Sequence, residues 1–283
     1  MRSLAGNVVV ITGAASGIGE ALAVELAQRG ARLLLADIDA TGLDRVISNL
    51  RTAGCDCFGL VTDTGNEAAI HALAAEAHSR FGGADVLINN AGVSLVSSVE
   101  KLETADAHWL MNINFWGVVH GCRAFLPQMR TRPDALLVNI SSIFAMVSMP
   151  TQSIYNASKA AVRGFSDGLR EELRGSTVKV LCVHPGGIQT NIANKARITD
   201  LATVAGSAQE LRDNFSQVAR TSPQQAAQTI IAAIVAGKTR VLIGTDAKVL
   251  DFLYRLVPTR SSAWLTNMSN HLRRKAQARK HTV

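Results

Sequence analysis

The sequence lacks several features that mark whole classes of protein. No run of about 18 apolar residues occurs, which is the length that a helix needs to cross a membrane. The first residues enter an extended apolar stretch almost at once and do not have the layout of a signal peptide. There is no internal repeat and no low-complexity segment. Because 47% of the residues are hydrophobic and 18% are charged, the chain can bury a sizeable core, and we expect a folded, cytoplasmic protein.

Cysteine and metal-ligand patterns are also sparse. The chain has four cysteines, and only Cys55-x-Cys57 is spaced like a pair of ligands. No second Cys/His pair accompanies it, and the seven histidines show no metal-ligand spacing. We therefore interpret the cysteines as reduced, small apolar residues and predict no bound metal.

Positive charge is in excess, but only at one end of the chain. The formal net charge is +7, and residues 245–283 contribute +6 of it through eight Lys/Arg and two Asp. The remaining body is nearly neutral, so the high isoelectric point gives no support to nucleic-acid binding by the body.

Short β-branched runs alternate with longer helical patterns. The runs are almost continuously apolar, as in parallel strands that helices cover on both faces. The predicted strands are residues 7–12, 32–36, 57–61, 85–89, 135–140, 178–183 and 240–243. The predicted helices are residues 17–29, 41–52, 67–80, 105–130, 153–174 and 223–236. This alternation predicts an α/β fold, a doubly wound parallel sheet of about seven strands with helices on both faces.

Two stretches fall outside the alternation. Residues 186–222 are too long for an ordinary strand-to-helix connection and apolar enough to be ordered, which is typical of a lid over a substrate site. From Thr245 onward, apolar residues recur at helical spacing as far as Pro258. We expect a single catalytic domain over residues 1–244 and a basic, amphipathic, helical extension over residues 245–283.

A glycine-rich turn follows the first predicted strand and leads directly into a helix. Its sequence is Thr12-Gly13-Ala14-Ala15-Ser16-Gly17-Ile18-Gly19. Glycines let the backbone approach a pyrophosphate, and the helix N-terminus supplies free N–H groups. Asp37 closes the second strand 20 residues after Gly17, where a carboxylate can accept hydrogen bonds from the adenosine ribose. Together these features predict a dinucleotide site.

The same acid indicates NAD rather than NADP. A 2′-phosphate would be repelled by Asp37 and would need a nearby arginine. Ile38 follows Asp37, and the residue before Gly17 is not basic. Arg45 lies one helical turn further on, so some use of NADP stays open.

Tyr155 and Lys159 are four residues apart in a predicted helix, so both side chains point from one face. Free tyrosine titrates near pH ~10, and a nearby ammonium favours the phenolate and lowers that pKa. The pair suits an acid/base catalyst, although this spacing alone is more often a solvated helix face.

The chain resembles the short-chain dehydrogenase/reductase family over roughly residues 4–244. The motifs are weak singly but specific in combination, and they come in the family's order. They are Thr12-Gly13-x-x-x-Gly17-x-Gly19, Asn89-Asn90-Ala91-Gly92, Asn114, Asn139-Ile140-Ser141-Ser142, Tyr155-x-x-x-Lys159, and Pro185-Gly186 with Thr190. The resemblance implies a Rossmann fold and hydride transfer between a nicotinamide cofactor and an alcohol or ketone.

The resemblance also implies roles for four residues. Tyr155 would be the general acid/base, and Ser142 would hold the substrate oxygen beside it. Lys159 would bind the nicotinamide ribose and lower the pKa of Tyr155. Asn114 would position a water that links Lys159 to solvent. Ser142 is chosen over Ser141 because the family places its serine 13 residues before the tyrosine.

Further residues are implied for the cofactor. Asp63, with Thr64, would accept a hydrogen bond from the adenine amino group, and Asp63 can also cap the following helix. The predicted cofactor residues are Gly13, Ser16, Gly17, Ile18, Gly19, Asp37, Asp63, Thr64, Asn90, Ala91, Gly92, Tyr155, Lys159, Pro185, Gly186, Ile188 and Thr190.

The predicted substrate pocket lies at the carboxyl ends of the strands. Its predicted residues are Ser142, Ser94, Val96, Phe144, Met149 and Gln152, with Leu95, Met146 and Val147 nearby. Most are apolar, which predicts an uncharged, largely apolar secondary alcohol or ketone. Lys195 and Arg197 in the lid weaken that inference. We interpret His184 as a packed or solvent-facing residue rather than a catalytic one.

Several alternatives stay open at this point. A catalytically idle dinucleotide sensor or scaffold on the same fold would be free to lose Asn114, Ser142, Tyr155 or Lys159, yet all four are intact. A methyltransferase would not need Tyr155 and Lys159 in register with Ser142. Large apolar side chains in the 105–130 and 153–174 helices, with the resemblance, predict a homodimer or homotetramer. For the extension, helices packed on the body compete with weak peripheral membrane contact.

Overall fold

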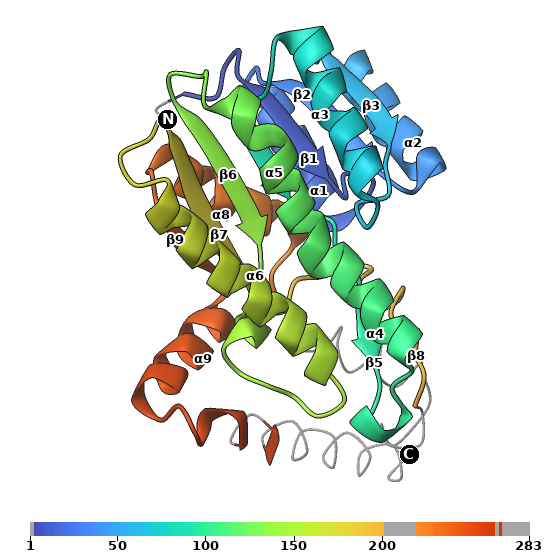
Figure 1. Ribbon diagram of the computed structural model, residues 1–283, viewed down its shortest axis with the longest axis vertical. Helices are drawn as coiled ribbons and strands as arrows, with labels where there is room; N and C mark the ends of the chain where they lie inside the picture. Colours follow the sequence, from blue (N-terminus) through green and yellow to red (C-terminus); the bar gives the residue numbers. More distant parts are fainter. Residues whose placement is uncertain (1–2, 201–218, 264–265, 268–283) are drawn as a thin grey trace.

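A seven-stranded parallel sheet forms the centre of the computed structural model, which describes residues 3–200, 219–263 and 266–267 (Figure 1). The strand order is β3-β2-β1-β4-β6-β7-β9. The strands are β1 Val8–Thr12, β2 Arg32–Asp37, β3 Cys57–Val61, β4 Val86–Asn89, β6 Ala135–Ile140, β7 Val178–Pro185 and β9 Arg240–Ile243. The order reverses between β1 and β4, and the carboxyl ends of strands beside such a reversal are where open α/β sheets bind ligands.

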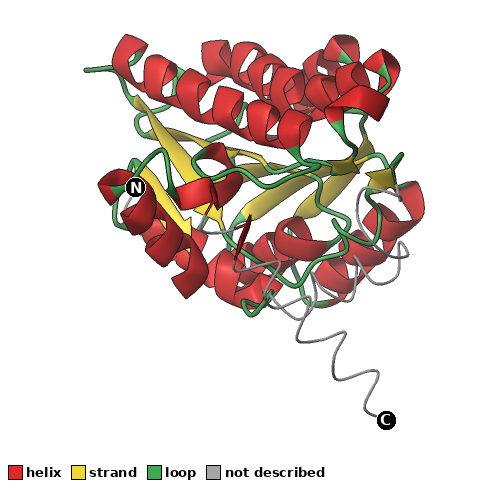
Figure 2. Cartoon of the chain, turned by 90° about the horizontal axis from the view of Figure 1, so that it is seen from below, coloured by secondary structure: helices red, strands yellow, loops and turns green. Residues whose placement is uncertain are grey.

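Helices cover both faces of this sheet (Figure 2). On one face lie α1 Gly17–Gln28, α2 Ala40–Thr52 and α8 Pro223–Val235, which share one buried cluster with the strands. On the other face lie α3 Glu67–Phe81, α5 Gly117–Met129 and α6 Ser153–Glu172, which share a second cluster. The predicted doubly wound α/β fold is therefore confirmed.

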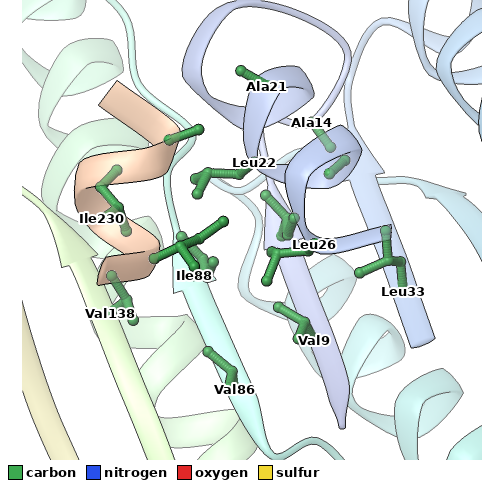
Figure 3. Packing of buried hydrophobic residues seen from close by; sticks show 14 of the residues in the cluster. Val9, Ala14, Ala21, Leu22, Leu26, Leu33, Val86, Ile88, Val138 and Ile230 are labelled. Atoms are coloured by element: carbon green, nitrogen blue, oxygen red, sulfur yellow. The ribbon is translucent and has the colours of Figure 1, made fainter. Parts of the chain in front are cut away.

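Apolar strand residues explain why the two layers of helices form. Val9, Val86 and Ile88 are fully buried on one face of the sheet, where Leu22 and Leu26 of α1 pack onto them (Figure 3). Burying a Leu or Ile side chain contributes roughly 1.5–3 kcal/mol. Since both sides of each strand are apolar, the sheet is stable only when helices cover both faces.

The seven strands lie within two residues of their predicted bounds, but one predicted helix is not continuous. Residues 105–130 form α4 Thr104–Met111, a π-helical turn at Asn112–Trp116 (η2) and then α5. A π turn inserts an extra residue into a helix and often marks a functional site. Here it carries Asn114, which is fully buried.

A second, two-stranded sheet lies at the carboxyl edge of the main sheet. Its strands, β5 Leu95–Val96 and β8 Arg197–Ile198, are parallel and were not predicted. β8 belongs to the predicted lid, of which residues 201–218 lie outside the described residues. Buried Asp200 ties β8 to the segment after β5, because it accepts hydrogen bonds from Ser98 Oγ at 2.5 Å and Lys101 Nζ at 3.1 Å.

The predicted helical stripe after Thr245 forms helix α9 Thr245–Leu256. Ala247 and Leu250 pack into a small cluster with Ile143, Met146 and Val147, around the short helix η3 Ile143–Ala145. The domain boundary at residue 244 stays a prediction. The basic cluster that begins at residue 273 lies outside the described residues. Among the described residues, no helix is long and apolar enough to cross a membrane.

Candidate active site

The turn between β1 and α1 leaves almost no space for side chains. A Cβ on Gly13 would lie 2.8 Å from Ala91 Cα, and one on Gly19 would overlap the Gly13 carbonyl oxygen. Gly17 has a φ of +59°, which favours glycine. The side chain of Ser16, at the N-cap of α1, makes no capping hydrogen bond. The first N–H groups of α1, which include that of Ile18, are therefore oriented to receive an anion.

A hydrogen-bond network holds this turn against the end of β4. Asn90 Nδ2 donates to the carbonyl oxygens of Thr12, at 2.9 Å, and Gly13, at 3.0 Å. Thr12 Oγ1 in turn accepts from the backbone N–H groups of Asn90 and Ala91, both at 3.1 Å. The Asn90 side chain thus fixes the glycine turn against the end of β4. Thr12 was predicted only as a member of the glycine motif, and its hydrogen bonds with Asn90 and Ala91 were not predicted.

Asp37 ends β2 beside the glycine turn, as predicted. Its carboxylate accepts from Ala15 N at 2.9 Å and from Asp39 N at 3.0 Å. Arg45, the basic residue that left NADP open, is held by Glu20 at 2.6 Å and donates to the Ala15 carbonyl oxygen at 3.0 Å. Its guanidinium is therefore already paired with a carboxylate of α1.

Asp63 does not cap the helix that follows it. Its carboxylate accepts from Gly65 N at 2.9 Å, while Asn66 is the N-cap of α3 and accepts from Ala68 N and Ala69 N. One residue, Thr62, separates Asp63 from the end of β3. Asp63 is exposed and Thr64 is buried, so the Asp63 carboxylate is accessible to an adenine ring at this edge of the sheet.

Tyr155 and Ser142 meet at the carboxyl end of β6. Tyr155, in the first turn of α6, is 9% exposed, and its ring packs edge-to-face on Phe144 with centroids 6.3 Å apart. Its hydroxyl is close enough to the Ser142 side chain for that side chain to lower the pKa of Tyr155. Ser141 is turned elsewhere and donates from Oγ to the Lys159 carbonyl oxygen at 2.8 Å. The structure thus brings Ser142, rather than Ser141, to the tyrosine.

Lys159 lies one turn after Tyr155 on the same face of α6, and it is buried. Its Nζ donates to the Ile140 carbonyl oxygen at 3.1 Å and lies 5.9 Å from the centroid of the Tyr155 ring. A Cβ on Gly92 would lie 3.4 Å from this Nζ and 3.3 Å from Asn114 Oδ1. Lys159, Gly92 and Asn114 therefore meet at one point.

The pKa values of this pair differ from the prediction. Burial raises the pKa of Tyr155 to about 12, and the hydrogen bond with Ser142 offsets only part of that rise. Burial also lowers the pKa of Lys159 to about 8. The expected lowering of the Tyr155 pKa by Lys159 is absent from the protein alone, because burial dominates the pKa of each group.

Asn114 is placed by the π turn and by contacts on both sides of it. Its Oδ1 accepts from Val93 N at 2.8 Å, and its Nδ2 donates to Val93 O at 3.0 Å and Ser158 Oγ at 3.2 Å. Ser158 Oγ donates to the Tyr155 carbonyl oxygen at 2.7 Å. Asn114 therefore connects the segment after β4 to the helix that carries Tyr155 and Lys159. Ser158, which lies between Tyr155 and Lys159 in the sequence, was not predicted as a site residue.

The segment after β7 runs back across the site. Pro185 ends β7, and Gly186 N donates to the Ile243 carbonyl oxygen at 2.9 Å. Ile188 is buried and pairs with Thr221 in a parallel bridge. The methyl of Thr190 would lie 3.2 Å from a Cβ on Gly17, so this segment reaches the glycine turn.

The predicted substrate residues fall into two groups. Ser94 and Val96 are buried at β5, and Leu95 and Phe144 share a cluster with Tyr155. The other two predicted residues, Met149 and Gln152, lie in the loop between η3 and α6: Met149 packs on the cluster that includes α9, and Gln152 directly precedes α6.

A surface hollow of about 340 Å³ lies beside the loop between η3 and α6, but it is not the reaction site. Phe144, Met149, Ser153, Ala157 and Ala160 are among its lining residues, whereas Ser142 and Tyr155 are not. Ala157 and Ala160 lie on the face of α6 opposite to Tyr155. The hollow therefore opens on the far side of this helix from the catalytic hydroxyl.

Two basic residues of the lid, Lys195 and Arg197, are each paired with a carboxylate. Arg197 stacks on the Trp109 ring, 3.6 Å from its centroid, and pairs with Asp106 at 2.8 Å. Lys195 lies 3.9 Å from a carboxylate oxygen of Asp39, at the dinucleotide end. Neither residue supplies a counter-ion at the reacting centre.

His184 is a packed residue, as one of the two sequence interpretations holds. It is buried within β7, and its Nδ1 lies 3.3 Å from the Ser142 carbonyl oxygen. Burial, with the positive charge of Arg240, lowers the pKa of His184 to about 4. A histidine that stays neutral and faces backbone is unsuited to exchange protons with substrate.

The described residues fit a nicotinamide dinucleotide. Glycines line the β1–α1 turn where a Cβ would meet backbone, and a carboxylate lies at the end of β2. A serine, a tyrosine and a lysine converge at the other end of the same edge. No group of three potential metal ligands occurs among the residues that the structure describes.

Comparison with known proteins decides the family. The family model for short chain dehydrogenases matches residues 7–200. The chain belongs to the short-chain dehydrogenase family. It is 40% identical over 261 residues to a putative oxidoreductase, SadH, of Mycobacterium tuberculosis, which covers 91% of this chain and 93% of that protein.

Solved structures agree with this assignment. A short-chain dehydrogenase/reductase from Burkholderia phymatum in complex with NAD superposes with a TM-score of 0.80 at 32% identity, covering 90% of this chain and 96% of that one. A short chain dehydrogenase from Burkholderia cenocepacia in complex with NADP gives a TM-score of 0.75 at 25% identity, covering 93% and 98%. The protein is therefore an oxidoreductase of this family, whose structural neighbours bind NAD or NADP.

Proposed function

We propose that the protein transfers a hydride between NAD and an uncharged, largely apolar secondary alcohol or ketone, with Tyr155 as the general acid/base. The observation that carries this proposal is the convergence of Ser142, Tyr155, Lys159 and Asn114 in one buried site at the carboxyl edge of the sheet. We also propose a cytoplasmic location, as the sequence predicts.

The residues divide the chemistry between them. The nicotinamide ring, when bound, accepts or supplies the hydride. Ser142 and Tyr155 both direct hydroxyls at the substrate oxygen, so they hold it where a proton can move along the hydrogen bond to Tyr155. During ketone reduction Tyr155 gives up its proton, and its high pKa keeps that proton on the hydroxyl at neutral pH. Lys159, if protonated, stabilises the phenolate that remains.

An absorbance assay of NADH with a panel of apolar alcohols and ketones tests this function. We expect turnover with part of the panel and none with carboxylated or phosphorylated analogues, because Arg197 and Lys195 are each already paired with a carboxylate. Binding of NADH without any turnover would favour the alternative of an idle dinucleotide sensor or scaffold.

We predict that NAD is preferred to NADP by at least about tenfold in kcat/KM, which corresponds to about 1.4 kcal/mol. A 2′-phosphate would approach the Asp37 carboxylate, and Arg45, which would have to neutralise it, is paired with Glu20. Kinetic constants for both cofactors on one substrate measure the preference. A preference for NADP would contradict the role given to Asp37.

We further propose a homodimer or homotetramer that forms through η2, α5 and α6. Trp116 is 46% exposed, and Phe115 and Phe165, packed edge-to-face beside it, are only partly covered. A second copy related by a two-fold axis would cover this aromatic surface. We predict at least a dimer by light scattering at micromolar concentration, and a monomer after Trp116→Glu; a monomeric wild type would contradict the proposal.

The outward face of α9 supports weak contact with an anionic membrane. Val249, Phe252 and Leu256 are between 47% and 62% exposed along this face, and Lys248 and Arg255 flank them. The inward face packs on η3, so both interpretations of this segment can hold together. Apolar side chains would enter the headgroup region while the basic ones meet anionic lipid.

Sedimentation with vesicles tests this contact. We predict that the full chain sediments with phosphatidylserine-containing vesicles at low salt and is released by high salt, because the basic residues contribute about 1 kcal/mol each near an anionic surface. The variant Phe252→Ser/Leu256→Ser keeps the buried face of α9 and should stay in the supernatant. Equal behaviour of the two proteins would eliminate α9 as the contact.

A further inference from the structure

Asp246, in the first turn of α9, reaches the segment that follows β7. Its carboxylate accepts a hydrogen bond from Gly187 N at 2.6 Å. The two residues are 59 positions apart in the sequence. A hydrogen bond from a backbone N–H to a carboxylate is short and about twice as strong as one between neutral groups.

Two glycines give this carboxylate its space. A Cβ on Gly186 or on Gly244 would overlap the carboxylate of Asp246. Gly244 also has a φ of +92°, but Gly186 does not have a positive φ. Its backbone would accept other residues, so the close approach of Asp246 accounts for glycine at position 186. Resemblance alone had assigned Gly186 to the cofactor.

The segment held by Asp246 continues to the residues expected at the nicotinamide. Backbone bonds fix it at Ile243, through Gly186 N, and at Thr221, through Gln189 N at 2.9 Å. The segment also contains the buried Ile188, and Thr190 at its end lies against Gly17. A shift of Gly187 would therefore move Ile188 and Thr190 relative to the glycine turn.

We propose that Asp246 is a positioning residue for the nicotinamide end of the cofactor, acting through Gly187. The inference rests on the proposed function in that the ligand is a nicotinamide dinucleotide. It makes the first turn of α9 a part of the cofactor site, although the family match ends at residue 200.

Two substitutions at Asp246 and one control on the same helix test the proposal. Asp246→Ala leaves Gly187 N without its partner, and we expect the Kd for NADH, measured by fluorescence, to rise about tenfold or more. Asp246→Asn keeps an oxygen acceptor and should stay within about threefold of wild type. The control is Asp251→Asn, since Asp251 pairs with Arg240 and Arg255 and does not touch the segment after β7. It should leave the Kd unchanged even if it loosens α9. Equal losses in Asp246→Ala and Asp251→Asn would overturn the proposal.

A double-mutant cycle with Gly186→Ala separates the two explanations of that glycine. The added methyl should weaken NADH binding by pushing the Asp246 carboxylate away. If the carboxylate is the obstacle, Gly186→Ala/Asp246→Ala binds no more weakly than Asp246→Ala alone. If the losses add, the cofactor itself needs Gly186 and the proposal fails.

A wild type that binds neither NADH nor NADPH would refute the proposed function, whereas an Asp246→Ala variant that binds like wild type would refute only this inference.

Discussion

Replacing Tyr155 by phenylalanine is expected to lower kcat by about 10²–10⁴-fold, the usual contribution of a general acid/base. The ring packs against Phe144 and beside Leu95 and Leu110, and phenylalanine keeps those contacts. Only the hydroxyl beside Ser142 is lost. The melting temperature and the Kd for NADH should therefore stay close to wild type, and steady-state kinetics on one substrate measure the loss.

The chain offers a matched control, because Tyr254 is its one other tyrosine. Tyr254 packs on the cluster between α9 and η3 and does not reach Ser142. Tyr254→Phe should retain wild-type turnover. If Tyr155→Phe also retains it, the proton must come from another group and the proposed mechanism is wrong.

The sheet was predictable because its signal is local. Each strand is a short apolar run, and a parallel sheet buried on both faces requires such runs. Glycines at 13, 17 and 19 and the acid at 37 likewise follow their strands at fixed spacing, so their common edge could be inferred before the fold was known. The family resemblance then placed Ser142, Asn114 and Lys159 at that edge.

What the sequence could not predict depends on contacts between distant segments. The helical pattern of residues 105–130 gives no sign of the π turn, which brings Asn114 to Val93 and Ser158. β5 and β8 have two residues each and pair only because the lid folds back onto the segment after β4. Asp246 looked like one acid in a basic extension, and its contact with Gly187 depends on how α9 docks.

The pKa of Tyr155 is another property that residue spacing does not predict. Spacing alone predicted that Lys159 would lower it, because the two side chains share a helix face. Burial was not visible from spacing, and it raises the pKa of Tyr155 while lowering that of Lys159. The desolvation of each group depends on the whole fold around it, which no local motif contains.

Lys159→Met is expected to abolish most activity and yet to stabilise the fold. The ammonium that would bind the nicotinamide ribose and stabilise the Tyr155 phenolate is lost, and kcat/KM should fall by about 10²-fold or more. Lys179→Met is the control, because Lys179 is exposed on β7 and should change neither property. Steady-state kinetics and thermal unfolding measure the two effects.

The gain in stability follows from the lowered pKa of Lys159. Burial shifts it from 10.5 to about 8. Below pH 8 the native state carries a buried ammonium, which costs about 3 kcal/mol at 1.36 kcal/mol per pKa unit. The lost hydrogen bond to the Ile140 carbonyl oxygen offsets about 1 kcal/mol of the gain from removing that charge.

The advantage of Lys159→Met should therefore depend on pH. Above about pH 8 native Lys159 releases its proton, whereas the unfolded chain keeps one until about pH 10.5. The unfolded state then binds more protons, so wild-type stability gains on the variant between these values. We expect the difference in melting temperature to be largest below pH 8 and to shrink by pH 10. A variant that is less stable than wild type at pH 7 would show that Lys159 is held by interactions stronger than its desolvation.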